Sequence, residues 1–286
     1  MHTRRCPRFV RGHRRTPDDR EATVLTTAFV PGSPNWIDLG TPDLDGATAF
    51  YGGLFGWRFR SAGPDAGGSG FFTSGGRTVA GGTELPAGAA PPSWTVYFRS
   101  DDVDATARAV RKTRGRVVVE PGEVTGKGRT AVLADPMRAP FGVRQPGTPA
   151  GLDVAGEDGA LCWVELHTTD VAGAAGFYHS VLGWETSSVA FPGGRYTCVN
   201  PAGAGEEGTF GGVVGPVGDP VEAGGGSYWL PYFAVADVDA VAGRARERGG
   251  AVRLEPTDVA GVGRTARLAD PRGARFAVLR PDPVRG

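Results

Sequence analysis

Glu165 and His167 are the two residues whose types and spacing could support acid–base chemistry. They are separated by one residue in an apolar segment typical of a β-strand. Strand residues i and i+2 point to the same face, with Cα atoms roughly 6.5–7 Å apart. A carboxylate beside an imidazole can act as a general acid–base pair near neutral pH. The pair could instead be a rim contact without a catalytic part, and the residues alone leave both alternatives open.

This pair lies in the second copy of an internal repeat. The segment Trp36–Asp43 returns as Trp163–Asp170, and Trp94–Pro146 aligns without a gap with Trp229–Pro281. Matching landmarks in the same order indicate a duplicated structural unit. The acid–base pair itself is not duplicated, because the first copy has Gly40 where the second has its histidine.

The repeat predicts two domains, at residues 31–146 and 161–282. A linker rich in Gly, Pro and Asp joins them at 147–160. Residues 1–30 have a different composition, with many arginines and no apolar run long enough for an export signal. We therefore expect a basic, disordered extension there.

Each domain is expected to contain two units that combine one helix with several strands. In the first unit, residues 36–40 form a short strand, and Asp43 is placed to cap a helix that ends at Gly56. Short strands follow at 70–73 and 78–82. The same rhythm begins again near residue 95 and twice more in the second copy, so the chain holds four such units in an α+β fold.

A set of recurring landmarks resembles a known superfamily. They are Asp43, Phe50-Tyr51, Leu54-Phe55-Gly56-Trp57, Asp102-Val103-Asp104-Ala105, Asp135-Pro136 and Phe141, each with a partner in the second copy. The pattern is similar to the vicinal oxygen chelate superfamily, which includes glyoxalase I, extradiol dioxygenases and bleomycin-resistance proteins. Within it, the chain resembles the actinobacterial two-repeat proteins labelled glyoxalase-like or hydroxylase-like. The resemblance implies two tandem domains, each a pair of βαβββ modules forming a cup-shaped sheet.

The resemblance also implies where a metal would bind. Metal-dependent relatives place His or Gln on the first strand, a second His on a later strand and a Glu on the last strand. The corresponding positions here are Trp36, Thr95 and Gly142 in the first copy and Trp163, Leu230 and Ala277 in the second. None of these side chains binds a divalent ion, so we expect no metal and no other cofactor. A relocated site using Asp38, or Glu165 with His167, would have too few ligands.

Strand alternation and the resemblance together predict which side chains face the cups. The predicted ligand-binding residues are Trp36, Asp38, Trp94, Thr95, Tyr97, Trp163, Trp229 and Tyr232. Trp and Tyr combine a large apolar face with a polar group, which suits a flat ligand. Alternatively, these aromatic rings fill the space that a metal occupies in the relatives.

Composition excludes several other classes of protein. Lys and Arg number 31, as do Asp and Glu, so the formal net charge is zero and bulk charge argues against binding to nucleic acid. No apolar run is long enough to span a membrane. The three cysteines show no metal-type spacing and speak against a disulfide framework. We expect a cytoplasmic monomer or homodimer.

The leading prediction is metal-independent binding, as in sequestration, of a hydrophobic and aromatic natural product or antibiotic. The alternative is a cofactor-independent enzyme of secondary metabolism, of the hydroxylase, isomerase or lyase type, with Glu165 and His167 as catalytic residues. A metal-dependent glyoxalase or dioxygenase ranks last, because the ligand positions hold other residues. The sequence leaves open whether the protein is an enzyme.

Overall fold

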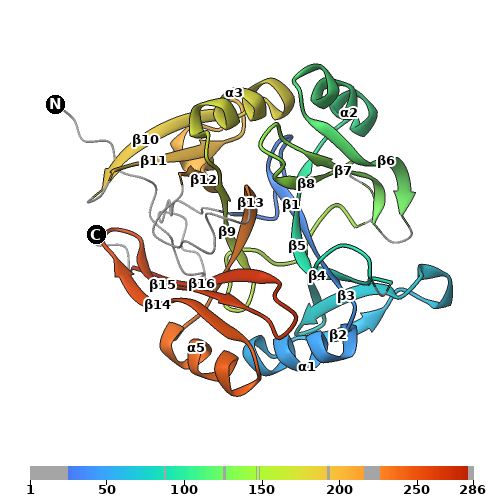
Figure 1. Ribbon diagram of the computed structural model, residues 1–286, viewed down its shortest axis with the longest axis vertical. Coiled ribbons are helices and arrows are strands. Elements are labelled where there is room, and N and C mark those ends of the chain that lie inside the picture. Colours follow the sequence, from blue (N-terminus) through green and yellow to red (C-terminus); the bar gives the residue numbers. More distant parts are fainter. Residues whose placement is uncertain are drawn as a thin grey trace, which may run out of the picture.

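The computed structural model describes residues 25–86, 88–124, 127–145, 147, 149–191, 194–215 and 226–282. Within these residues the chain forms two eight-stranded sheets with helices packed against them (Figure 1). The two sheets belong to successive halves of the chain and have the same strand order. This confirms the predicted α+β class with two tandem domains of paired βαβββ modules.

The first domain contains two modules. The first module consists of β1 (Pro34–Thr41), α1 (Leu44–Phe55), β2 (Arg58–Ser61), a short 3-10 helix (Pro64–Ala66), β3 (Ser69–Ser74) and β4 (Arg77–Glu84). The second module consists of β5 (Ser93–Arg99), α2 (Val103–Lys112), β6 (Arg116–Val124), β7 (Gly128–Ala134) and β8 (Pro140–Arg144). The strand β2 was not predicted from the sequence.

The second domain repeats this plan. Its first module consists of β9 (Leu161–His167), α3 (Val171–Leu182), β10 (Glu185–Phe191), β11 (Gly194–Asn200), a short 3-10 helix (Glu206–Gly208) and β12 (Gly211–Val214). Its second module consists of β13 (Tyr228–Ala234), α5 (Val238–Glu247), β14 (Ala251–Val259), β15 (Gly263–Ala269) and β16 (Arg275–Pro281).

Each sheet is continuous across its two modules. The strand order is β2-β3-β4-β1-β5-β8-β7-β6 in the first domain and β10-β11-β12-β9-β13-β16-β15-β14 in the second. The antiparallel pairs β1–β5 and β9–β13 join the modules at the centre of each sheet. The outer strands curve away from this centre and leave a concave face on each domain (Figure 1).

Local sequence explains where the helices begin and end. In the described residues, each of the four α-helices starts after an aspartate whose carboxylate accepts the backbone N–H three residues later; the four are Asp43, Asp102, Asp170 and Asp237. Gly56 and Gly183 end α1 and α3 in the left-handed conformation, with φ of 72° at both. The predicted cap at Asp43 and stop at Gly56 are both present.

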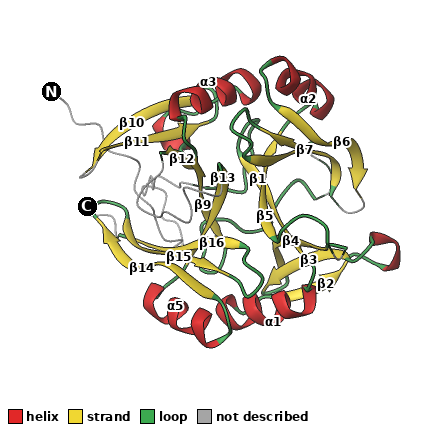
Figure 2. Cartoon of the chain, in the orientation of Figure 1, coloured by secondary structure: helices red, strands yellow, loops and turns green. Residues whose placement is uncertain are grey.

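The two sheets pack with their convex faces toward each other, so the concave faces open on opposite sides of the molecule (Figure 2). Helix α1 of the first domain lies beside α5 of the second, and α2 lies beside α3. One continuous hydrophobic core therefore extends through both domains. Aromatic rings from both halves meet there; Phe233 of β13, for example, contacts Trp57 and Trp94, with ring centroids 5.2 Å and 5.5 Å apart.

A buried hydrogen-bond relay crosses between the domains in this core. Trp94 Nε1 donates to the Tyr51 hydroxyl at 2.9 Å, and this hydroxyl donates to Asp270 of the other domain at 3.3 Å. The carboxylate of Asp270 also accepts backbone N–H groups of the turn between β15 and β16. The relay thus connects α1 to a turn of the second domain.

The second copy contains the equivalent relay, which runs from the second domain to an aspartate of the first. Trp229 Nε1 donates to the Tyr178 hydroxyl at 3.0 Å, and Tyr178 lies 3.4 Å from Asp135 of the first domain. Trp94 and Trp229 are therefore core residues on the convex side of their sheets. The expectation that they line the cups is wrong, because each alternates with the cup-facing residues of its strand and packs against a helix tyrosine.

The segment between the domains is part of the packed structure. Leu152 and Val154 of the predicted linker are buried in the shared core. Trp57 Nε1 donates to the carbonyl of Gly159 at 2.8 Å. Leu25, at the end of the predicted N-terminal extension, is also buried in the core, whereas residues 1–24 lie outside the described part of the chain.

Two observations concern the expected cellular compartment. None of the helices in the described ranges is both long and apolar enough to cross a membrane. Cys162 is a buried free thiol, but Cys198 is disulfide-bonded. The expectation that the cysteine pattern speaks against disulfides is therefore wrong at Cys198, and the cysteines give no support to a reducing compartment.

We predict that the relays contribute to the stability of both domains together. Replacing Tyr51 or Tyr178 by Phe leaves a buried indole N–H without an acceptor and removes a donor from a buried carboxylate. Each substitution should lower the free energy of unfolding by about 1–3 kcal/mol. The two losses should add in the double variant, because the relays share no residue. Urea unfolding measures both effects.

Ser180→Ala on the exposed face of α3 is the control for this experiment. It should change the free energy of unfolding by less than about 0.5 kcal/mol. Losses of that small size in both tyrosine variants would contradict the assignment of the relays as stabilising contacts.

Candidate functional site

Strand alternation brings the predicted site residues to the two concave faces. In β1, Trp36 and Asp38 point to the concave side, and their partners across the strand are Tyr97 and Thr95 of β5. Tyr97 in turn pairs with Gly142 of β8. We call the concave face formed by Trp36, Asp38, Thr95, Tyr97 and Gly142 the first cup.

The second domain provides the equivalent face. Trp163 and Glu165 of β9 pair with Tyr232 and Leu230 of β13, and Tyr232 pairs with Ala277 of β16. We call the face formed by Trp163, Glu165, His167, Leu230, Tyr232 and Ala277 the second cup. Four of its residues, Trp163, Leu230, Tyr232 and Ala277, belong to an apolar cluster that is separate from the shared core.

Glu165 is the centre of the polar contacts in the second cup. Its carboxylate accepts hydrogen bonds from the hydroxyls of Tyr232 at 2.8 Å and Tyr196 at 3.0 Å, and from Arg267 at 3.3 Å. His167 Nε2 lies 2.8 Å from the same carboxylate, at ion-pair distance. Three strands besides β9 therefore contribute side chains to this one group.

These contacts keep Glu165 ionised although only 6% of the residue is exposed. Burial pushes the pKa of Glu165 upward, but the contact with His167 and the charge of Arg267 outweigh burial and lower it to about 2. Burial and the charge of Glu165 raise the pKa values of Tyr196 and Tyr232 far above their usual range. Both phenols therefore remain neutral hydrogen-bond donors.

His167 is held between Glu165 and an aromatic ring. Its imidazole stacks on Tyr228 with centroids 4.8 Å apart and planes 2° from parallel. The guanidinium of Arg275 lies 4.8 Å from the centre of the same tyrosine ring. Because Nε2 faces the carboxylate of Glu165, Nδ1 is the ring nitrogen on the side away from that carboxylate.

The first cup has a different set of polar contacts. Asp38 forms an ion pair with Lys127 at 2.6 Å and lies 3.3 Å from the Thr83 hydroxyl. The guanidinium of Arg144 lies 4.8 Å from the centre of the Trp36 ring. In the first cup, the buried Asp38–Lys127 ion pair therefore takes the place that the Glu165–His167 contact has in the second cup.

The structure brings eight of the ten predicted site residues to the cups, four in each. Sequence reasoning missed Lys127 and Arg144 in the first cup and Tyr196, Tyr228 and Arg267 in the second. Arg267 could have been found from its position opposite Ala277 once the strand register was known. Tyr196 lies on β11, the counterpart of the strand predicted at 70–73, but the equivalent residue of the first copy is Ser69, so the repeat gave no signal for a tyrosine there.

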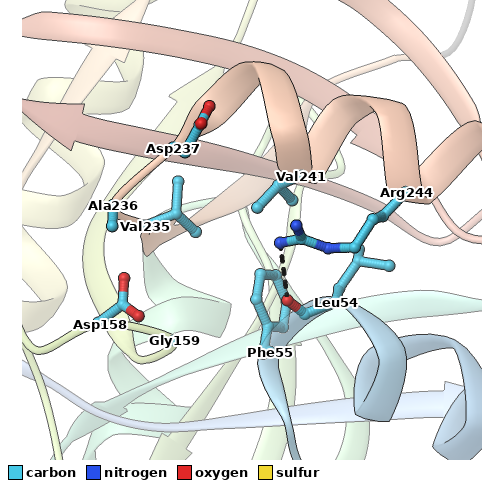
Figure 3. Close-up of a pocket in the computed structure, with 9 residues that line it drawn as sticks. All are labelled: Leu54, Phe55, Asp158, Gly159, Val235, Ala236, Asp237, Val241 and Arg244. Atoms are coloured by element: carbon cyan, nitrogen blue, oxygen red, sulfur yellow. Dashed lines mark hydrogen bonds between the residues drawn. The ribbon is translucent and has the colours of Figure 1, made fainter.

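A separate crevice lies between the domains, away from both cups (Figure 3). Its volume is about 280 Å³, and it is lined by Leu54, Phe55, Asp158, Gly159, Val235, Ala236, Asp237, Val241 and Arg244. Arg244 approaches the Leu54 carbonyl at 3.4 Å, across the domain boundary. None of the predicted site residues lines this crevice.

The fold and the cups define a two-domain protein of paired βαβββ modules whose concave faces are built from aromatic and charged side chains. The chain matches the Glyoxalase/Bleomycin resistance protein/Dioxygenase superfamily over residues 33–144 and 160–278, and it belongs to that superfamily. The predicted resemblance is confirmed.

Several relatives match nearly the whole chain. The anthracycline biosynthesis protein DauV of Streptomyces sp. (strain C5) is 38% identical over 277 residues, which cover 88% of this chain and 94% of DauV. CFP32 of Mycobacterium tuberculosis (strain CDC 1551 / Oshkosh), which is named as a glyoxylase, is 38% identical over 258 residues, covering 88% of this chain and 96% of CFP32.

Solved structures share the fold at low sequence identity. A 2,2',3-trihydroxybiphenyl 1,2-dioxygenase from Sphingomonas wittichii strain RW1 superposes with a TM-score of 0.60 at 16% identity, over 89% of this chain and 92% of that one. The Mn(II)-bound glyoxalase from Novosphingobium aromaticivorans gives 0.57 at 18% identity, over 88% and 84%. These similarities establish the fold alone.

The family's metal does not fit the residues of either cup. The implied ligand positions hold Trp36, Thr95 and Gly142 in the first cup and Trp163, Leu230 and Ala277 in the second, and none of these is the His, Cys, Asp or Glu that such a metal site requires. A Cβ atom at Gly142 would lie 2.0 Å from the Tyr97 ring, so a glutamate there would displace that ring. Within the described residues, no three His, Cys, Asp or Glu side chains gather as a metal site.

We predict that the free energy of unfolding depends on pH through Glu165, at pH values below the usual pKa of a glutamate. Because its pKa falls from 4.5 to about 2 on folding, its contribution is present above pH 4.5 and is lost as pH falls toward 2. Each pKa unit corresponds to about 1.4 kcal/mol, so the contribution is at most a few kcal/mol. The difference in unfolding free energy between wild type and Glu165→Gln should shrink between pH 5 and pH 3 in urea titrations.

The exposed Glu123 supplies the control, since its side chain is 73% exposed. Glu123→Gln should leave the pH dependence of unfolding as it is in the wild type. A constant difference between wild type and Glu165→Gln across this pH range would show that Glu165 is not held in its ionised form.

Proposed function

We propose that the second cup binds a planar, hydrophobic aromatic molecule of secondary metabolism without a metal ion. The observation that carries this proposal is the apolar cluster of the second cup, which is separate from the shared core and surrounds an ionised carboxylate. Ligand sites combine an apolar lining with a few placed polar groups in this way. Two relatives from Streptomyces, DauV and DnrV, are named as anthracycline biosynthesis proteins, which favours a fused-ring aromatic ligand.

Each part of the second cup would contact a different part of such a ligand. The rings of Trp163 and Tyr232 and the side chain of Leu230, which are 5%, 7% and 1% exposed, would line the cup around flat rings. With Nε2–H directed at Glu165, the Nδ1 atom of His167 can accept a hydrogen bond from a ligand hydroxyl. No step of this binding needs a metal, because the residues at the family's ligand positions contribute apolar surface instead.

A second candidate function is acid–base catalysis on the same ligand. The observation that favours it is the 2.8 Å contact between Glu165 and His167. An imidazole supported by a buried carboxylate can take a proton from one ligand atom and return it to another, which is an isomerisation without any cofactor. Binding remains the leading function because the carboxylate of Glu165 is already occupied by hydrogen bonds from Tyr196, Tyr232 and Arg267.

The first test concerns metals. Protein purified without added metal should contain less than about one-tenth of a divalent ion per chain, because neither cup offers a ligand set. Chelator treatment, or addition of Mn²⁺, Zn²⁺, Ni²⁺ or Fe²⁺, should shift the melting temperature by no more than about 1 °C. Elemental analysis and thermal melting measure these two quantities. A stoichiometric ion that chelation removes with loss of stability would contradict metal-independent binding.

The second test concerns the ligand. Titration of anthracyclines and related fused-ring aromatics should quench tryptophan fluorescence, because Trp163 lines the second cup. Trp163→Phe should lose most of the quenching. His167→Ala should weaken binding roughly 3–10-fold through the loss of one hydrogen bond, about 0.5–1.5 kcal/mol. Absence of quenching by every compound would contradict an aromatic site in this cup.

His179→Ala is the matched control, because His179 is exposed on α3 and its imidazole contacts the carbonyl of Trp184, outside both cups. It should bind the compounds as the wild type does. Mass spectrometry of the same incubations separates binding from catalysis. A changed ligand in excess of protein, formed by the wild type and reduced by 10²–10⁴-fold in His167→Ala (about the range of acid–base assistance), would favour the enzyme.

A further inference from the structure

The crevice between the two domains has no part in the proposed function (Figure 3). It is bounded by the C-terminal end of α1, the segment before β9, the residues that follow β13 and the first turns of α5. Its volume of about 280 Å³ corresponds to roughly nine water molecules at about 30 Å³ each. Since ligand sites occur preferentially at domain interfaces, the crevice is a candidate site for a molecule of roughly ten non-hydrogen atoms.

One wall of the crevice is apolar. Leu54, Val235 and Val241 belong to the shared core and line the crevice from that side. Phe55, which is half-buried at the end of α1, continues the same wall. None of these four side chains can form a hydrogen bond, so this wall suits the hydrocarbon part of a ligand.

Two opposite charges lie at the two ends of the crevice. Figure 3 shows Asp158 at one end and Arg244 of α5 at the other. Arg244 approaches the carbonyl of Leu54 at 3.4 Å. No ion pair joins Asp158 or Arg244 to another charged side chain of the described residues. Both charges therefore remain available to a ligand.

The internal repeat contains a second region of the same construction. Trp57 Nε1 donates to the carbonyl of Gly159 beside the crevice, and its counterpart Trp184 Nε1 donates to the carbonyl of Gly32, both at 2.8 Å. Helix α2 lies beside α3 in that region, as α5 lies beside α1 at the crevice. The region around Gly32 is therefore the structural equivalent of the crevice.

Neither charge of the crevice is present in the equivalent region. The repeat aligns Asp158 with Pro31 and Arg244 with Ala109, and neither of these counterparts can carry a charge. The helices of the two domains pack against each other at both places. Packing of the duplicated unit therefore does not require Asp158 or Arg244.

The apolar wall also distinguishes the crevice from its equivalent. Val235 and Val241 correspond to Ser100 and Thr106, whose hydroxyl groups form a hydrogen bond at 2.8 Å. Valine cannot form such a bond, so the crevice has apolar surface where the equivalent region has a polar contact. The apolar wall and the two charged ends together favour a ligand that is both apolar and charged.

We propose that the crevice binds a small zwitterion whose ammonium and carboxylate groups are separated by an apolar segment. The ammonium group contacts the carboxylate of Asp158, and the carboxylate of the ligand accepts hydrogen bonds from the guanidinium of Arg244. The hydrocarbon segment lies against the wall formed by Leu54, Val235 and Val241. A ligand with a single charge would use only one end of the crevice. This site is separate from both cups, so its test is independent of the proposed function.

Calorimetric titration with straight-chain ω-amino acids tests the recognition of both charges. The probes are γ-aminobutyrate, δ-aminovalerate and ε-aminocaproate, which differ in the separation of the two charged groups. Each is compared with the straight-chain carboxylate and the straight-chain amine of the same length, which carry one charge each. All of these compounds are aliphatic, so none is a flat ring system of the kind proposed for the second cup.

The best-fitting ω-amino acid should bind one per chain and at least about fivefold more tightly than either analogue with a single charge, because hydrogen bonds between charged groups are the strong ones. Equal affinities for the zwitterion and its analogues would overturn the proposal. Absence of binding by every ω-amino acid up to roughly 10 mM would also overturn it.

Two substitutions assign the charged groups of the probe to the two ends of the crevice. Asp158→Asn should remove the advantage of the zwitterion over the carboxylate analogue and keep its advantage over the amine. Arg244→Gln should have the opposite effect. Each advantage that is lost should shrink to less than about twofold. Persistence of both advantages in either folded variant would contradict the assignment.

Asp45→Asn and Arg108→Gln are the matched controls, because both residues are exposed on helices and lie outside the crevice. Both variants should bind the best probe within about twofold of the wild type. A crystal structure with this probe should show it between Asp158 and Arg244. Electron density for the probe at any other place would overturn the proposal.

Discussion

The shared aromatic core between the two sheets is the constraint on which the rest of the structure depends. Each domain has one convex face and one concave face, and a sheet face covered with Val, Phe and Trp must be buried. The two convex faces bury each other, with α1 and α5 on one side and α2 and α3 on the other. Reciprocal relays from Tyr51 to Asp270 and from Tyr178 to Asp135 then fix the relative position of the domains. Since the convex faces bury each other, the proposed binding site lies on a concave face.

The two cups are built from equivalent strands of the duplicated unit, but their polar side chains differ. An indole, a carboxylate and a glycine occupy equivalent positions in both: Trp36, Asp38 and Gly81 in the first cup, and Trp163, Glu165 and Gly212 in the second. In the second cup the carboxylate is surrounded by phenols, Arg267 and His167. In the first it pairs with Lys127. Different partners around one carboxylate give the two cups different polar surroundings on one fold, and fold alone does not define function.

The same positions explain the absence of the family's metal ligands. A metal site needs three or more donor side chains that converge on one point, so replacing them removes the site. In the first cup, a neighbouring side chain also fills the space of one missing donor. The Tyr97 ring covers Gly142, so the ring fills the volume that a glutamate at that position would need. A glutamate restored at Gly142 would therefore clash with Tyr97 before it could bind an ion.

The sequence by itself determined the repeat, the order of helices and strands, the helix caps at Asp43 and its equivalents, and the face of each central strand on which Trp36, Asp38, Glu165 and His167 lie. These are local properties, set by the periodicity of apolar residues and by helix capping.

Which side chains contact those residues was decided by the tertiary structure alone. Trp94 and Trp229 went to the core because their strands pack against helix tyrosines on the convex side. Lys127, Arg144, Tyr196 and Arg267 reached the cups from strands and turns whose register is fixed by sheet pairing, over distances in sequence that no local pattern encodes. Contact across a curved sheet depends on strand order and curvature, and these follow from how the whole chain buries its apolar faces.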